Sequence, residues 1–250
     1  MRPHRCKYWL NPNITDKDEF RENVKEVCDL YHGAPELDKQ GIKTVSLDEC
    51  CGIQALERTN PTKPIQAGIP ERIESEYIRH GTLSLIANFD VVSGKILSST
   101  IGETRNEEDF LEHIKALIAK YPQVKEWRFV ADQLNIHKSE SLVRCIAKKL
   151  KNKDDLGVKG KSGVLKSMDS RADFLKDPSH SIRFLYTPKH CSWMNQIEIW
   201  FGILSRKVIK RGNFISKEDL KEKLHSFIEY FNKTMAKPYK WTFNGIPLKA

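Results

Sequence analysis

The chain has 250 residues, 39% of them hydrophobic, a composition that excludes a disordered chain and a membrane protein. No apolar run approaches the roughly 20 residues that span a bilayer, and the basic N-terminus lacks the apolar stretch of a signal peptide, so we expect a cytoplasmic protein without a membrane. The formal net charge of +9 suits a polyanionic partner such as DNA, although charge alone is equally consistent with simple solubility.

Residues 1–40 are predicted to be a lead-in or linker segment, and residues 41–250 have the length of one large domain. Within the lead-in, apolar residues at helical spacing predict one helix that Asp16 or Asp18 caps. Pro35 is expected to interrupt this helix, because proline lacks a backbone N–H.

The first half of the domain predicts strands. The short β-branched run at 42–49 predicts a strand, and the proline-containing stretch 51–78 predicts an irregular insertion or surface loop. The apolar alternation over 82–92 and the return segment 95–101 then predict a hairpin, joined by a Ser-Gly turn.

The second half predicts strands that alternate with helices. Short apolar segments at 126–131 and 182–186 predict strands, whereas the Lys- and Gly-rich stretch 151–180 predicts a long exposed loop. The predicted helices begin near Thr104 with a capping-box pattern, cover about 139–150, follow Thr187-Pro188, and run from Ser216 to about Phe231. This order implies an α/β fold, with a mixed sheet flanked by helices.

Three acidic residues occupy suggestive places in this order. Asp48 and Asp132 end predicted strands, and Glu198 lies early in the helix that follows the last strand. Functional side chains of α/β sheets gather at strand ends. Clustered carboxylates repel one another unless cations neutralise them, and oxygen-only ligands suit Mg²⁺ or Mn²⁺. Two such ions activate water or a sugar hydroxyl for attack on a phosphodiester.

Each of these residues also has a purely structural interpretation. Aspartate is common at strand ends as a turn former, and Asn195-Gln-Ile-Glu198 has the capping-box form with Glu198 as the third helical residue. His190 and Cys191 are further candidate ligands, although a histidine in a loop is more often a surface residue. From the residues alone, both interpretations stay open.

Five segments carry a resemblance to a known family: SLDECCGIQALER (46–58), ERIESEYIRHGTLSLIANFDVVSGK (71–95), VADQLNIHKS (130–139), YTPKHCSWMNQIEIWFGILSR (186–206) and FNKTMAKPYKWTF (231–243). On these segments the chain resembles the DDE-type transposases of the mariner-like superfamily, in its bacterial insertion-sequence branch. The resemblance covers nearly the whole chain from about residue 40, and the third and fourth segments together are highly specific.

The resemblance implies a ribonuclease-H-like fold in which residues 41–250 are the DDE catalytic domain. It implies that Asp48, Asp132 and Glu198 are the catalytic, metal-binding triad, which holds two Mg²⁺ or Mn²⁺ ions. The implied activity is metal-dependent cleavage of DNA at the ends of a transposable element, followed by strand transfer into target DNA. Four other residues of the signature segments are expected to support the site: Asn135, His137, His190 and Trp193.

The resemblance also implies partners. Double-stranded DNA, as element ends and as target, and a second copy of the chain in a homodimer are expected in the active complex. Relatives usually carry an N-terminal helix-turn-helix region, and no convincing copy precedes residue 40, so we expect a separately encoded end-recognition chain or a fragment. Cys50 and Cys51 stand where a basic and a small polar residue are expected, and the six cysteines form no C-x-x-C pair that would indicate zinc.

Two other functions compete with transposition. One is a nuclease or junction resolvase of the same fold without strand transfer, against which the segment 186–206 argues. The other is a DNA-binding remnant of a decayed element, against which the presence of all three acidic residues argues. A strand-transfer assay on element ends with Mg²⁺ separates these three functions.

Overall fold

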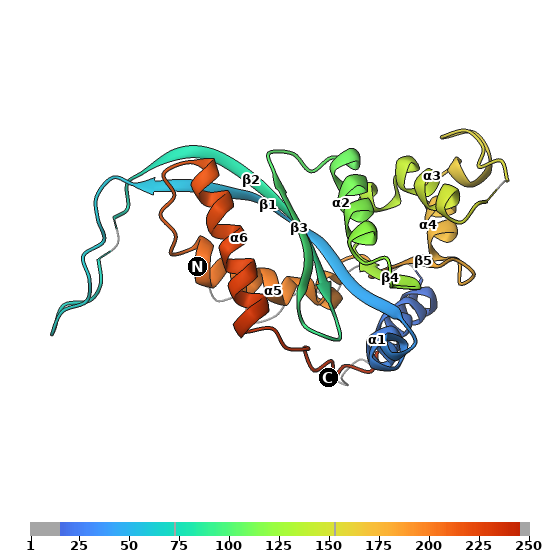
Figure 1. The fold of residues 1–250 in the computed structure, drawn as a ribbon, viewed down its shortest axis with the longest axis horizontal. Helices are drawn as coiled ribbons and strands as arrows, with labels where there is room; N and C mark the ends of the chain where they lie inside the picture. Colours follow the sequence, from blue (N-terminus) through green and yellow to red (C-terminus); the bar gives the residue numbers. More distant parts are fainter. Residues whose placement is uncertain (1–15, 73, 153, 246–250) are drawn as a thin grey trace.

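The computed structural model describes residues 16–72, 74–152 and 154–245. Its centre is a five-stranded sheet in the order β3-β2-β1-β4-β5 (Figure 1). The strands are β1 (Ile42–Arg58), β2 (Tyr77–Asp90), β3 (Ile96–Gly102), β4 (Glu126–Ala131) and β5 (Ile182–Tyr186). The first three strands pair antiparallel, whereas β4 runs parallel to both β1 and β5. The predicted mixed α/β sheet is therefore confirmed.

Helices cover both faces of this sheet (Figure 1). The α-helices of the described residues are α1 (Lys17–Lys39), α2 (Glu107–Lys120), α3 (Glu140–Lys149), α4 (Met168–Lys176), α5 (Ile197–Leu204) and α6 (Lys217–Thr234). On one face α2, α3 and α4 pack around Phe129 and Phe184. On the other face α5 and α6 pack around Trp200, and α1 covers Val130. No helix of the described residues is long and apolar enough to cross a membrane.

The N-terminal helix α1 is longer than predicted. It begins after Asp16, whose side chain accepts the backbone N–H groups of Asp18 and Glu19, and it continues through Pro35 to Lys39. The expected interruption at Pro35 is wrong because packing holds the helix: five of its side chains are buried, among them Tyr31. The helix therefore joins the core of the domain, while the division at residue 40 stays a prediction.

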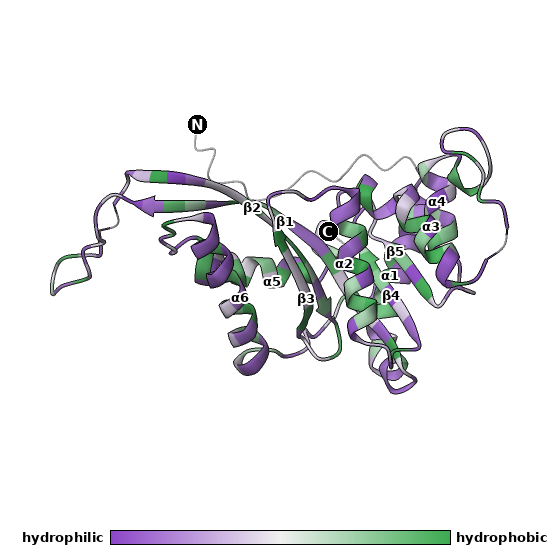
Figure 2. Ribbon diagram, turned by 45° about the horizontal axis from the view of Figure 1, so that its top comes forward, coloured by the Kyte–Doolittle hydropathy of each residue, from purple (hydrophilic) through white to green (hydrophobic). Residues whose placement is uncertain are grey.

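Strands β1 and β2 extend well beyond their predicted ends. Their outer parts form a two-stranded arm that projects from the body, with hydrophobic and hydrophilic residues alternating along it (Figure 2). The prediction of an irregular segment from residue 51 is wrong for 51–58, which belongs to β1. Pairing continues there because Gly52, at φ +63°, lies at a shift in the register between β1 and β2. Ile53 then packs in the hydrophobic core on the side of α5 and α6.

Helix α4 lies within the stretch that was predicted to be a loop. Its main anchor is a buried arginine rather than an apolar stripe: Arg171 Nε donates to the carbonyl of Lys138 at 2.7 Å. The cap of α2 also differs from the prediction. Asn106, rather than Thr104, is the N-cap, and it forms the capping box with Asp109. The predicted strands at 126–131 and 182–186 are confirmed.

Candidate active site

Asp48 lies in the middle of β1 rather than at its end. The parallel pairing of β1 with β4 covers Ile42 to Ser46, so Asp48 stands just beyond the last paired residue. Asp132 directly follows the C-terminal end of β4. The two aspartates therefore meet where β4 ends and β1 continues, as the neighbouring strands predicted. The prediction that the first strand ends at Asp48 is wrong, because β1 stays paired with β2 there, with Asp48 opposite Ala87.

The carboxylate of Asp48 is held on both oxygens and is only 7% exposed. Its Oδ1 accepts the backbone N–H of Glu49 at 2.7 Å, and its Oδ2 accepts Nδ2 of Asn195 at 3.1 Å. Burial, together with the negative charge of Asp132, raises the pKa of Asp48 to about 7. A neighbouring cation would remove much of that penalty.

Asp132 is more open and is held by different donors. Its Oδ1 accepts the backbone N–H of Leu134 at 2.9 Å and lies 2.9 Å from Nδ1 of His137. Burial acts to raise the pKa of Asp132, but the hydrogen bond and the charge of His137 outweigh it and hold this pKa below its usual value. Asp132 is therefore ionised under conditions in which Asp48 is still titrating.

His137 joins Asp132 to a fourth carboxylate, that of Glu49. Its Nε2 lies 2.9 Å from Oε1 of Glu49, and its ring packs against Phe110 at 4.7 Å between centroids. Both His137 and the Glu49 side chain are buried. Burial alone would lower the pKa of His137, but hydrogen bonds with Asp132 and Glu49 raise it to about 10. The ring is therefore an imidazolium that donates to both carboxylates.

Glu49 was not singled out in the sequence. It directly follows Asp48, and successive side chains of a strand point to opposite faces, so it lies on the α2 side of the sheet. The one sequence signal that could have found it is its position as a second acidic residue directly after Asp48.

Glu198 is the second residue of α5, and its side chain is exposed. The carboxylate is nevertheless partly buried, and this burial and the negative charge of Asp132 both raise its pKa. The two carboxylates therefore lie within electrostatic range of each other. The predicted capping box is wrong: the N-cap is Gln196, and no side chain caps the helix.

Asn195 forms its side-chain hydrogen bonds with residues of β1 and does not cap α5. Its amide nitrogen donates to the carbonyl of Leu47 at 2.9 Å as well as to Asp48, and its Oδ1 accepts the hydroxyl of Ser46. The hydroxyl of Ser46 in turn accepts the backbone N–H of Ile197, at the start of α5. Asn195 therefore ties the helix that carries Glu198 to the strand that carries Asp48.

The three acidic residues are neighbours without forming a closed cluster. Within the described ranges, no group of three or more His, Cys, Asp or Glu side chains is arranged to hold a metal ion. Asp48 and Asp132 interact directly through their charges, and Glu198 interacts with Asp132. Carboxylate oxygens that repel one another fit a hard divalent cation, so the donor set suits Mg²⁺ or Mn²⁺.

Residues 43–221 match the family model described as the DDE superfamily endonuclease. The chain belongs to this family. The match spans most of the sequence and includes all three acidic residues of the predicted triad. No curated protein matches the sequence.

Solved structures give the fold of this DDE endonuclease. It is similar to the Mos1 transposase in a paired-end complex with the left transposon end, at a TM-score of 0.50 and 12% identity over 90% of this chain. This chain spans 59% of the length of that Mos1 chain. The catalytic domain of the Mos1 mariner transposase matches with a TM-score of 0.49 and 12% identity, over 88% of this chain and 85% of that domain. The likeness to the paired-end Mos1 structure agrees with the predicted α/β fold, a mixed sheet flanked by helices.

The remaining predicted residues of the DDE endonuclease surround the carboxylates unevenly. Asn135 is exposed at the start of a 3-10 turn, and His190 is exposed with a left-handed backbone, at φ +63°. Lys138, which was not predicted, is buried with its Nζ 4.5 Å from the centre of the Tyr186 ring, and it donates to Oε1 of Gln133. A positive charge therefore lies close to Asp132.

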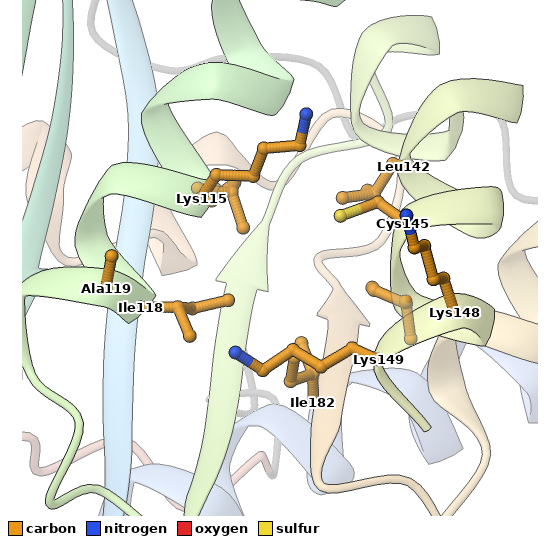
Figure 3. A pocket seen from close by; sticks show the side chains of 10 residues that line it. Lys115, Ile118, Ala119, Leu142, Cys145, Lys148, Lys149 and Ile182 are labelled. Atoms are coloured by element: carbon orange, nitrogen blue, oxygen red, sulfur yellow. The ribbon is translucent and has the colours of Figure 1, made fainter. Parts of the chain in front are cut away.

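One cavity of the described residues lies away from this site. It has a volume of about 400 Å³ and lies between α2 and α3, with an apolar floor and three lysines at its rim (Figure 3). Its lining includes Ile182, which pairs with Trp127 at the opposite end of β4 from Asp132. This cavity is therefore separate from the candidate carboxylates.

Proposed function

We propose that this DDE endonuclease is the catalytic domain of a transposase that cleaves DNA at element ends and joins the freed strand to target DNA. The observation that carries the proposal is the meeting of Asp48 and Asp132 at the point where β4 ends. Glu198 lies close enough for the charge of Asp132 to raise its pKa. We assign all three as the catalytic, metal-binding residues.

The proposed cofactor is a pair of Mg²⁺ or Mn²⁺ ions. Burial and the negative charge of Asp132 raise the pKa values of both Asp48 and Glu198. A bound cation would offset both effects. Bound ions would polarise the phosphodiester and activate the attacking water or hydroxyl. The protein contributes the positioning: Asn195 orients Asp48, and His137 orients Asp132.

The proposed partner is double-stranded DNA, both as element ends and as target. The net charge of +9 supports this, as do the basic residues Arg206, Lys207, Lys210 and Arg211 that follow α5. Arg206 and Lys207 lie in a π-helical turn, η4 (Ser205–Ile209), and are exposed. These side chains lie on the same continuous helical segment as Glu198, so DNA held by them is directed toward the carboxylates.

A homodimer in the active complex is also proposed. Three exposed isoleucines on and beside the arm support it, because apolar side chains that project from the body into solvent can be buried against a second copy: Ile65, Ile69 and Ile78. A separately encoded helix-turn-helix chain is proposed to read the element ends. The bacterial insertion-sequence branch is proposed from the resemblance of the five segments, and a cytoplasmic location is proposed with it.

The test uses DNA that flanks the reading frame on each side, labelled at the 5′ end of the strand whose 3′ end is freed by cleavage, together with plasmid target DNA and Mg²⁺. A transposase cuts these ends and joins them to the plasmid. A nuclease or resolvase cuts without joining, and a decayed remnant binds without cutting. The assay is run with and without any helix-turn-helix protein that is encoded beside the frame, so that missing end recognition is separated from missing chemistry.

A further inference from the structure

Trp193 exposes an unusual amount of aromatic surface for a residue so close to the carboxylates. It lies in a 3-10 turn (Ser192–Met194) between β5 and α5, and it is 54% exposed, whereas Cys191 and Met194 on either side are buried. An exposed indole offers a flat face on which a nucleobase can stack.

The turn that carries Trp193 is anchored to the site. Asn195, two residues later, donates to Asp48 Oδ2 at 3.1 Å. Two residues of chain span at most about 7 Å, so the backbone of Trp193 lies at the rim of the carboxylates. Glu198 follows on the first turn of α5.

The turn is also preorganised. Backbone hydrogen bonds close it at three places: Cys191 N–H to Pro188, Met194 N–H to Cys191, and Asn195 N–H to Ser192. Met194 and Cys191 pack in the core under α1. The indole is thus presented from a fixed base and needs little ordering when it binds a ligand.

A lysine precedes the turn in the chain: Lys189 is exposed, as is His190 next to it. Burial lowers the pKa of Lys138, and Lys189 adds to this effect, so the two ammonium groups lie near each other. Aromatic side chains interleaved with cations are the usual means of holding unpaired bases and their phosphates.

A simpler role for Trp193 is to hold the C-terminal segment. Phe243 packs against its ring at 5.4 Å with an angle of 66° between planes, and two aromatics earlier in that segment pack in the same way, Tyr239 on Phe89 and Trp241 on Tyr31. Trp193 differs from Phe89 and Tyr31, which are both buried, because half of its surface is still exposed beyond that contact.

We propose that Trp193 stacks on an unpaired nucleobase of the DNA strand whose phosphodiester enters the carboxylate site. Bases inside a duplex are already stacked on both faces, so the exposed indole selects a strand that is frayed or single-stranded next to the cleaved bond. This inference rests on the proposed function, and it names the form of DNA that the site prefers.

Binding is measured in Ca²⁺, so that the result does not depend on cleavage. The probes are one blunt duplex and the same duplex with a short single-stranded 3′ extension, and the affinity of each is obtained by fluorescence anisotropy. We expect the wild type to bind the extended duplex roughly tenfold more tightly, as one stacked base predicts. Trp193→Ala should lose that preference while it keeps the affinity for blunt DNA, and Trp193→Phe should keep part of it.

Two control variants separate stacking from structure. Tyr230→Ala removes another exposed aromatic, on α6, and should leave the preference unchanged. Phe243→Ala removes the contact with the C-terminal segment. If Trp193 serves only that segment, Trp193→Ala and Phe243→Ala will lower the melting temperature alike and both will keep the wild-type preference, which overturns the proposal.

A 2-aminopurine in the extension gives a direct readout. Stacking on the indole should quench its fluorescence on binding to the wild type and not on binding to Trp193→Ala. Equal quenching by both proteins contradicts the proposal. Failure of the proposed function would appear separately, as wild-type protein that stacks the base and never cuts in Mg²⁺.

Discussion

Nδ1 of His137 lies 2.9 Å from Oδ1 of Asp132, and the opposite nitrogen of the same ring lies 2.9 Å from Glu49. The buried imidazolium therefore fixes the orientation of one candidate metal ligand and is itself fixed by a carboxylate from the neighbouring strand. Among the described residues, none donates to the other oxygen of Asp132, so that oxygen is available to a cation.

We expect Glu49→Gln to weaken metal binding without unfolding the protein. An amide at this position no longer favours the imidazolium, so His137 holds Asp132 less firmly, and loss of such a supporting contact typically costs roughly 10- to 100-fold in metal affinity. The Mn²⁺ concentration for half-maximal cleavage should rise by this factor, and excess Mn²⁺ should restore the rate.

The matched control for Glu49 lies on the same strand. Glu57 on the arm pairs with His80 at 2.7 Å, outside the site, and Glu57→Gln should leave the Mn²⁺ dependence unchanged. A merely structural role for Glu49 would lower the melting temperature of the metal-free protein and leave the Mn²⁺ midpoint where it was.

Asn195 offers a second test of positioning. Asn195→Ala leaves Leu47 and Ser46 without their buried partner, which should lower stability by about 1–3 kcal/mol. Cleavage should fall further than this loss explains, because Asp48 is no longer oriented. Asn213→Ala removes an exposed asparagine whose Oδ1 accepts the Arg58 backbone N–H, and it should have little effect on cleavage. Cleavage that tracks only the folded fraction would reduce Asn195 to a structural residue.

The sequence predicted the parts of the site that depend on local pattern. Strand β4 is a short apolar run, so its end, and with it Asp132, could be placed to the residue. The meeting of Asp48 with Asp132 was expected only if their two strands are neighbours, and the parallel pairing of β1 with β4 meets that condition. The resemblance to DDE transposases selected Glu198 over its capping interpretation.

What the sequence did not predict depends on contacts between distant residues. Asn195 was interpreted as a helix cap because the local pattern allows it, whereas its partners lie on β1, almost 150 residues earlier. Helix α4 was missed because its anchor is the bond from Arg171 to Lys138, which no apolar periodicity reports. The arm was missed because the prolines of the stretch 51–78 indicated an irregular segment, whereas they all lie beyond Arg58, where β1 ends.

The metal-free protein should lose stability as the pH rises. The folded pKa of Asp48, about 7, lies above its ordinary value of 3.8, so the folded state binds this proton more tightly and the contribution of Asp48 declines between about pH 4 and pH 7. Burial lowers the pKa of His113 from 6.5 to about 4, and this offsets the decline up to about pH 6.5. The raised pKa of His137, about 10 against 6.5, extends the decline above pH 6.5. The lowered pKa of Asp132 acts only in acid, near and below pH 3.8.

Melting temperatures in EDTA from pH 5 to pH 9 test this expectation. Asp48→Asn should make the melting temperature rise with pH up to about pH 6.5, because His113 then acts without the opposing contribution of Asp48, and it should leave the alkaline part unchanged. Added Mn²⁺ should change the same part of the wild-type curve in the same direction, because a bound cation favours the ionised carboxylate. An unchanged slope in Asp48→Asn would show that Asp48 does not titrate in this range.

DNA binding should depend strongly on salt and little on sequence. Each phosphate contact adds about 0.9 to the slope of log affinity against log salt concentration. Replacing Arg206, Lys207, Lys210 and Arg211 with glutamine should therefore lower this slope by up to about 3.6. Affinity that stays constant over a fourfold increase in salt, or a strong preference for one short duplex, would contradict the expectation.

The role of Glu198 is decided by comparison with a second helix. Glu198 and Glu218 are both the second residue of a helix, α5 and α6 respectively, and both are exposed. As helix-terminal acids they are equivalent, because each interacts favourably with the N-terminal end of its helix. They differ in surroundings: the charge of Asp132 raises the pKa of Glu198, whereas a backbone hydrogen bond lowers that of Glu218.

We therefore expect Glu198→Gln and Glu218→Gln to melt close to the wild type without metal and to differ in everything that involves metal. Glu198→Gln should lose cleavage of labelled DNA by several orders of magnitude, because the glutamine removes a charge and a strong oxygen donor from a hard-cation site. It should also lose most of the rise in melting temperature that Mn²⁺ gives the wild type, since a ligand that binds only the folded state stabilises it. Glu218→Gln should keep both properties. Cleavage near the wild-type rate by Glu198→Gln would remove Glu198 from the proposed triad and leave Asp48 and Asp132 to hold the metal with another group.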